Sequence, residues 1–65
     1  MKYYEYDINY DAKNGSMGVV AVPKKMKSAD LLIHLQKIGE VEPVSPRDFD
    51  CDEITKKEYE EEVAR

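Results

Sequence analysis

The sequence predicts a small, single α+β domain with the element order ββα(β)α. Three observations carry this prediction: alternating apolar residues at the N-terminus, an Asn-Gly pair before a second valine-rich segment, and two later segments with helix-capping signals. We expect an N-terminal antiparallel hairpin packed on one helix and an acidic C-terminal helix, and we leave a third short edge strand open. The expected segments are a hairpin over 1–23, a helix over 28–39, an extended acidic segment over 40–53 and an acidic helix over 54–65.

The first predicted element is a β-strand over residues 2–10. Apolar side chains occupy every second position of this segment, and mostly polar or charged ones stand between them. A period of two places alternate residues on one face of a strand, so we expect this face to be buried. Its members are Tyr4, Tyr6, Ile8 and Tyr10.

A turn over residues 11–15 separates this strand from a second one over residues 16–22. The turn ends in Asn-Gly, a pair that tolerates the positive φ of tight hairpin turns. The second strand is rich in valine, and a proline ends it. Tyr3 is expected on the outer face of the hairpin, together with Val20 and Val22 if those two side chains point outward.

The segment 28–39 carries helix signals at both ends. Ser28 is a good N-cap residue, and Asp30 follows in the first turn, where a negative charge suits the helix dipole. Gly39 stands where helices commonly end in a left-handed residue. The apolar residues between them recur at helical intervals and are expected to cover the hairpin. They are Leu31, Leu35 and Ile38, with Leu32 beside them.

The acidic segment 40–53 is the hardest part of the chain to assign. Pro43 and Pro46 each lack the backbone donor that a central strand needs. A short edge strand over 40–44, or one over 47–50, stays open. If either pairs beside the first strand, the sheet order becomes 2-1-3, which keeps the crossover right-handed.

The C-terminal segment predicts a helix that begins with a capping box. Thr55 and Glu58 have the spacing at which each side chain accepts a hydrogen bond from the other residue's backbone N–H. Tyr59 and Val63 are one helical turn apart and are its only good apolar contacts, with Ile54 just before the cap.

Charge is distributed unevenly along the chain. Residues 48–62 hold eight carboxylates and two lysines, a local net charge of −6, whereas the whole chain carries −4. Lys56 and Lys57 begin the predicted last helix and Glu60–Glu62 end it, which is the reverse of the order that the helix dipole favours. This acidic balance suits neither direct nucleic-acid binding nor anionic membranes, and it favours a partner protein with a basic surface.

These charges predict a non-enzymatic interaction module: an inhibitor or modulator that presents carboxylates to a basic, nucleic-acid-binding partner. Acidic residues three or four positions apart on a helix have Cβ atoms about 5–6 Å apart, and their carboxylates could occupy a groove meant for phosphates. Small inhibitors of phages and mobile elements, directed against defence systems, often act in this way. The plainest interpretation is a solvated acidic surface. The residues predicted to bind the partner are Asp48, Asp50, Asp52, Glu53, Glu58, Glu60, Glu61, Glu62 and Tyr3.

The alternative function is that of a structural or regulatory subunit, or a homodimer. Four of the five tyrosines lie within the first ten residues, and tyrosine is enriched at protein interfaces. On this alternative the chain associates through the Tyr-rich hairpin, and the association tolerates salt because it depends on apolar contact.

Catalysis is not expected from this composition. Cys51 and His34 supply a thiol and an imidazole, but the aspartates on either side of Cys51 should raise the pKa of its thiol and disfavour the reactive thiolate. The single cysteine fits a reducing cytoplasm. No apolar run is long enough to cross a bilayer, and the N-terminus lacks the pattern of a signal peptide.

A metal site is not expected either. Asp48, Asp50 and Asp52 have the spacing that opens a calcium loop. However, Glu53 stands where the loop needs a glycine, and Tyr59 stands where it needs a bidentate glutamate. The sequence therefore predicts an acidic loop before the last helix, without a catalytic residue, a metal ion or a cofactor.

Overall fold

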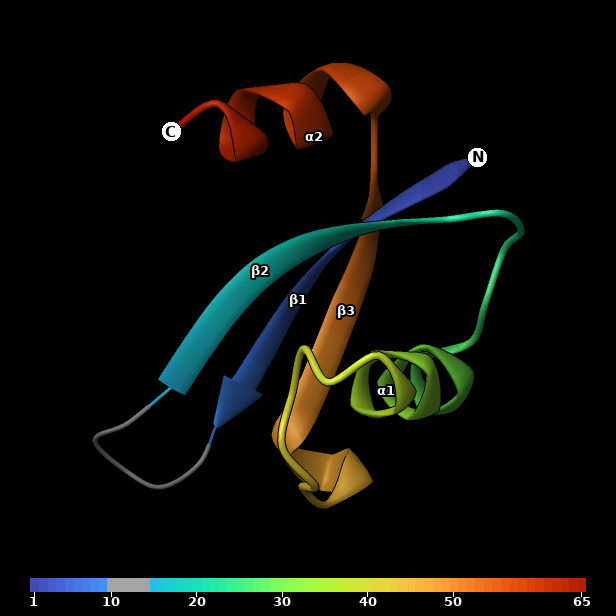
Figure 1. The fold of residues 1–65 in the computed structure, drawn as a ribbon, viewed down its shortest axis with the longest axis vertical. Coiled ribbons are helices and arrows are strands. Elements are labelled where there is room, and N and C mark those ends of the chain that lie inside the picture. Colours follow the sequence, from blue (N-terminus) through green and yellow to red (C-terminus); the bar gives the residue numbers. More distant parts are fainter. Residues whose placement is uncertain (10–14) are drawn as a thin grey trace.

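The computed structural model describes residues 1–9 and 15–65 as a single α+β domain with a three-stranded antiparallel sheet (Figure 1). This confirms the predicted fold class. Tyr10 and most of the predicted turn lie outside the described residues. The elements are β1 (Lys2–Asn9), β2 (Gly15–Val22), α1 (Ser28–Lys37), the 3-10 helix η1 (Pro46–Asp48), β3 (Phe49–Ile54) and α2 (Lys56–Val63).

The sheet has the strand order β2-β1-β3, so β1 is its central strand. Both neighbours pair with β1 in antiparallel orientation, and Tyr4 of β1 lies opposite Val20 of β2 and Glu53 of β3. This is the 2-1-3 order that the sequence left open. It brings residues from the two ends of the chain side by side on β1 and β3.

The third strand lies later in the chain than expected. Residues 40–44 form no strand, and the predicted strand over 47–50 overlaps β3 only at its last two residues. Pro46 instead begins η1, where the Ser45 side chain accepts a hydrogen bond from the Arg47 N–H at 3.4 Å. The prediction of an acidic loop before the last helix is therefore wrong, because residues Phe49–Ile54 form β3.

The apolar core lies between the sheet and α1. Val22 is fully buried and Val20 packs against the core, because the register with β1 places both on the same face as Tyr4. The outward orientation considered for these two valines is wrong, since register decides which face of a strand is buried. The buried core residues are Tyr4, Tyr6, Ile8, Val22, Leu31, Leu32, Leu35 and Phe49.

The two ends of α1 differ from each other in how well they are capped. Lys27, not Ser28, occupies the N-cap position, and no side chain caps this end. At the C-terminal end, Gly39 has a φ of 78° and donates to the Gln36 carbonyl at 3.2 Å, while Glu40 donates to the Leu35 carbonyl at 3.0 Å. This pair of bonds is a Schellman motif, and it confirms the predicted C-cap glycine.

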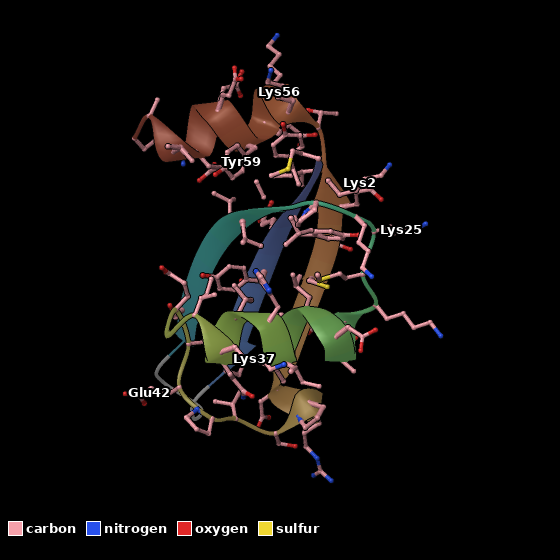
Figure 2. All side chains as sticks on the ribbon, turned by 45° about the vertical axis from the view of Figure 1, so that its right-hand side comes forward. Lys2, Lys25, Lys37, Glu42, Lys56 and Tyr59 are labelled. Carbon is pink, nitrogen blue, oxygen red and sulfur yellow. The ribbon has the colours of Figure 1, made fainter. Side chains whose placement is uncertain are left out.

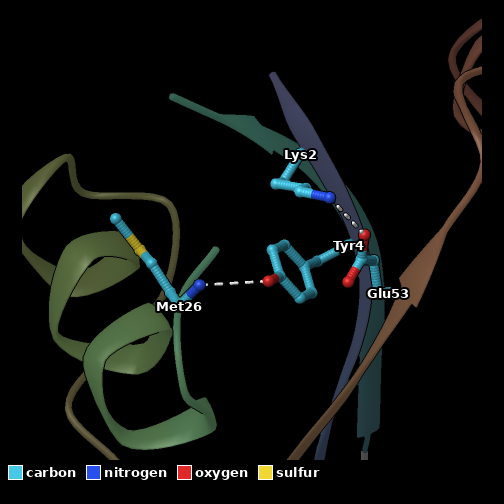
Figure 3. A network of polar contacts seen from close by, with 4 residues as sticks. All are labelled: Lys2, Tyr4, Met26 and Glu53. Carbon is cyan, nitrogen blue, oxygen red and sulfur yellow. Dashed lines mark hydrogen bonds and ion pairs between the residues drawn. The ribbon is translucent and has the colours of Figure 1, made fainter. Parts of the chain in front are cut away.

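Figure 3 shows two polar contacts of the sheet: one joins β1 to the segment before α1, and the other joins β1 to β3. The Tyr4 hydroxyl accepts a hydrogen bond from the Met26 N–H at 3.0 Å, which ties the connector between β2 and α1 to the sheet. Lys2 Nζ lies 3.3 Å from a carboxylate oxygen of Glu53, an ion pair between the two strands that neighbour each other in the sheet.

The helix α2 lies on the opposite side of the sheet from α1 (Figure 1). Its predicted capping box is confirmed: the Glu58 N–H donates to the Thr55 hydroxyl at 3.1 Å, and the Thr55 N–H donates to the Glu58 carboxylate at 3.1 Å. No residue of α2 is buried, and Val63 is 60% exposed, so its predicted apolar contact is wrong. Ile38, at the end of α1, is also exposed against expectation.

Candidate functional site

The face of the sheet that points away from α1 is the candidate site, and we call it the outer face. Because Tyr4, Tyr6 and Ile8 are buried beneath α1, the residues between them on β1 belong to the outer face. The strand register then assigns alternate residues of β2 and β3 to the same face. Its residues are Tyr3, Glu5, Asp7, Met17, Val19, Ala21, Asp50, Asp52 and Ile54.

Four acidic residues of the outer face form two directly opposed pairs, and we call them the carboxylate quartet. Glu5 of β1 lies opposite Asp52 of β3, and Asp7 lies opposite Asp50. Opposed residues on neighbouring strands have Cβ atoms about 4.5–5.5 Å apart, so each pair brings like charges together. The ion pairs of the described residues include none of the four.

The β2 side of the outer face is apolar instead. Met17 lies opposite Asp7, and Val19 lies opposite Glu5. An open hollow of about 320 Å³ lies between these β2 residues and the C-terminal end of α2, where Glu62 and Arg65 contribute to its wall. The outer face therefore changes from apolar at β2 to acidic at the quartet on β1 and β3, so an apolar patch lies beside charged groups, as at interfaces with an apolar centre and a polar rim.

One aromatic contact joins α2 to this face. The rings of Tyr3 and Tyr59 have centroids 4.9 Å apart at an angle of 44°. Tyr59 projects from the side of α2 that faces the sheet (Figure 2). Tyr3 is thus on the outer face, as expected, but its ring is partly covered by the chain's own helix.

The other residues predicted to bind a partner are distributed over several surfaces. Asp50 and Asp52 belong to the carboxylate quartet, whereas Glu53 is on the α1 side of the sheet, paired with Lys2. Glu58 is part of the capping box, and Asp48 lies in η1. The remaining acids lie on α2, where Glu60 is 3.9 Å from Lys56, Glu62 is 3.5 Å from Arg65, and Glu61 is exposed.

Sequence reasoning missed two members of the quartet, Glu5 and Asp7. Their signal was present in the chain, since both alternate with the buried tyrosines of β1. Their meaning depended on the pairing with Asp50 and Asp52, which are more than forty residues later and whose strand was not assigned.

The chemistry of Cys51 agrees with the expected unreactive thiol. Cys51 lies opposite Tyr6, on the α1 side of β3, and is half-buried. Burial raises the pKa of its thiol, and the neighbouring carboxylates of Asp52 and Asp50 raise this pKa further. At neutral pH the side chain is therefore held in its protonated, poorly nucleophilic form.

The aspartates of the calcium-like spacing do not form a loop. Asp50 and Asp52 lie on a strand, while Asp48 lies in η1 before it. Within residues 1–9 and 15–65, no three acidic, histidine or cysteine side chains converge in a way that could hold a metal ion. Neither helix of this part of the chain has the length and apolar character needed to cross a membrane.

Comparison of the chain with known proteins identifies no relative that could assign a function to the outer face. No protein-family model, curated protein or solved structure matches the chain.

Proposed function

We propose that this protein is a non-enzymatic interaction module, an inhibitor or modulator that presents its carboxylate quartet to a basic surface on a partner protein. The observation that carries this proposal is the direct opposition of Glu5 with Asp52 and of Asp7 with Asp50 on the outer face. Like charges placed opposite each other destabilise a sheet. An arrangement that fold stability does not favour is a reason to look for a benefit outside the fold.

A basic partner supplies that benefit in physical terms. Lysine or arginine side chains placed over the quartet would relieve the repulsion within each pair. This relief would make the free energy of binding more favourable. Complementary charge also accelerates association and selects against acidic partners. The apolar residues beside the quartet, Met17 and Val19, add the contact area that charge alone does not provide.

The experiment compares two double variants of equal net charge. Asp50→Asn with Asp52→Asn neutralises one member of each opposed pair, whereas Glu60→Gln with Glu61→Gln neutralises exposed acids on α2. Wild type and both variants are immobilised, exposed to a lysate of the native host and eluted with salt. Polylysine, measured against all three, reports the effect of net charge alone.

The proposal predicts a partner that the wild type and the α2 variant retain and that the quartet variant binds at least about tenfold more weakly. Its binding should weaken steeply between about 50 mM and about 300 mM salt. Equal retention by both variants, with only the polylysine response changed, would mean a solvated acidic surface. Loss from the α2 variant alone would move the binding surface to Glu60 and Glu61.

A finer form of the proposal makes the protein an inhibitor of the phage or mobile-element type, whose acids occupy the nucleic-acid groove of the partner. Duplex DNA should then compete with the chain for the captured partner, and a partner bound equally well at saturating DNA would refute this form. We also propose a cytoplasmic location, because the single cysteine, Cys51, fits a reducing compartment.

A further inference from the structure

We propose that the outer edge of β2 pairs with β2 of a second copy of this chain, in antiparallel orientation, so that the two sheets become one continuous sheet. This inference does not depend on the proposed function, because it rests on the backbone edge of β2 and not on the carboxylate quartet, although both proposals use Met17 and Val19.

The first argument is that the two edges of the sheet are protected differently. β2 and β3 are the edge strands, and each pairs with β1 on one side only among the described residues. β3 is short and carries Asp50, Asp52 and Glu53, charges of the kind that prevent pairing between sheet edges. β2 is eight residues long and contains no charged residue and no proline. It therefore presents unpaired backbone groups without the usual protection.

The second argument is the shape of the surface along this edge. An open hollow of about 270 Å³ is lined by residues from both sides of the sheet, so it follows the edge of β2. Val19 and Tyr59 line it from the outer face, and Val20, Leu35 and Ile38 line it from the α1 side. Ile38 is 53% exposed although it is apolar. Glu40 also lines the hollow, and a neighbouring strand would cover the apolar part of its wall.

The third argument is that β2 complements itself. A two-fold axis perpendicular to the sheet, midway between the Val19 residues of the two copies, keeps each face continuous, because residues of equal parity then lie opposite each other. Met17 faces Ala21 of the second copy, Val20 faces Gly18, and Val22 faces Ser16. In each of these three pairs a larger side chain meets a smaller one, Val19 meets its own copy, and no charge meets a charge, so the register is favourable for a second copy of this chain.

The Gly18 position supports this register. A Cβ atom at Gly18 would lie 2.5 Å from the Tyr6 hydroxyl oxygen, so the Tyr6 ring already covers the space above this glycine. An aromatic ring over an edge glycine is a known way to stabilise strand pairing. Val20 of the second copy would then lie beside the Tyr6 ring, an aromatic pair with a β-branched residue.

The test begins with the wild-type chain and needs no variant. Sedimentation equilibrium from about 10 µM to about 1 mM should show a monomer–dimer equilibrium. Hydrogen exchange at the two extremes should show slower exchange for amides of β2 in the concentrated sample and unchanged exchange for β3. A chain that stays monomeric up to about 1 mM overturns the proposal. This holds even if the edge of β2 pairs with an extended peptide of another protein.

Charge variants at Val19 test the register. In the proposed dimer residue 19 meets its own copy, so Val19→Lys and Val19→Glu should each abolish the dimer, and mixing the two should restore it as a heterodimer. Ile33→Lys, an equal change at an exposed position of α1, should leave the dimer intact. A dimer that survives both Val19 variants, or folded variants that do not associate on mixing, would refute this register.

Discussion

The two faces of the sheet are built on different principles. On the α1 side, eight apolar side chains are at most 8% exposed, and the hydroxyl of Tyr4 has a backbone partner. On the outer face, α2 buries none of its residues, and its aromatic contact with the sheet is the pair of Tyr59 with Tyr3. The fully buried core of the described residues therefore lies on one side of the sheet.

This difference separates stability from the residues available for binding. The α1 side cannot be altered without loss of packing, because a chain of this size has little core to lose. The outer face contributes little to that core, so its residues are free to serve another role. Its opposed carboxylates are acceptable only because the other face supplies the stability.

The largest expected effect comes from removing a core side chain. Leu35 is fully buried in α1, and Leu35→Ala should lower the free energy of unfolding by about 2–5 kcal/mol, through lost burial and the cavity left behind. This is a large part of the stability of a small domain. Urea titration followed by circular dichroism measures it. Ile33→Ala, at a position of the same helix that is 50% exposed, is the control and should cost less than about 1 kcal/mol.

A smaller effect is expected where β2 is tightly packed against Tyr6. Gly18→Ala places a Cβ atom 2.5 Å from the Tyr6 hydroxyl oxygen, so the ring must move, at a cost of about 1–3 kcal/mol. Urea denaturation should show that Tyr6→Val, although destabilising by itself, removes most of this additional cost. An unchanged cost of Gly18→Ala in the Tyr6→Val background would show that contact with the ring is not responsible, since the lower backbone entropy of alanine in the unfolded chain by itself favours the folded state.

The parts of the fold that could be predicted from sequence are those with a local signal. The alternation in β1, the capping box of Thr55 and Glu58 and the positive φ of Gly39 each depend on a few neighbouring residues. Such patterns determine local structure through side-chain period and backbone sterics. The fold class followed from them.

The parts that could not be predicted depend on contacts between distant residues. β3 has only Phe49 and Cys51 as inward apolar residues, too few for a clear period of two. The side of the sheet on which Val20 lies depends on the strand register, which places it opposite Tyr4. The carboxylate quartet needed both pieces of information together, so half of it was missed and the acids of α2 received more weight.

The contact between α2 and the outer face should be modest. Tyr59→Ala and Tyr3→Ala should each reduce stability, and a double-mutant cycle should give a coupling of about 0.5–1.5 kcal/mol, as for other aromatic pairs. Amides of α2 should exchange faster in Tyr59→Ala, while those of α1 should not change. A coupling near zero would mean that the contact between these two rings does not stabilise the position of α2 on the sheet.

A still smaller effect, of opposite sign, is expected within the quartet. Asp52→Lys replaces a like-charge pair with Glu5 by an opposite-charge pair and should stabilise the fold by about 0.2–1 kcal/mol at low salt. The gain should decrease as salt is added. Glu42→Lys, an equal change of charge at an exposed position outside the helices and strands, is the control. If both variants stabilise equally, relief of the overall negative charge explains the effect and the pairing does not.

The smallest expected effect is a change in the reactivity of the Cys51 thiol, which lies on the α1 side, caused by a charge on the outer face. Asp52 and Asp50 lie on the outer face, while Cys51 between them points to the α1 side, and both carboxylates add to the rise in the pKa of its thiol that burial causes. Asp52→Asn removes one of these negative charges, so the pKa of Cys51 should fall and more thiolate should form at a given pH.

Alkylation of the folded protein by iodoacetamide, measured at a fixed pH, should therefore be faster in Asp52→Asn than in wild type. Asp48→Asn, which removes a carboxylate of η1 and leaves Asp50 and Asp52 in place, should react close to the wild-type rate. If the two variants react equally fast, the carboxylates do not reach the thiol through the strand, and burial alone accounts for its low reactivity.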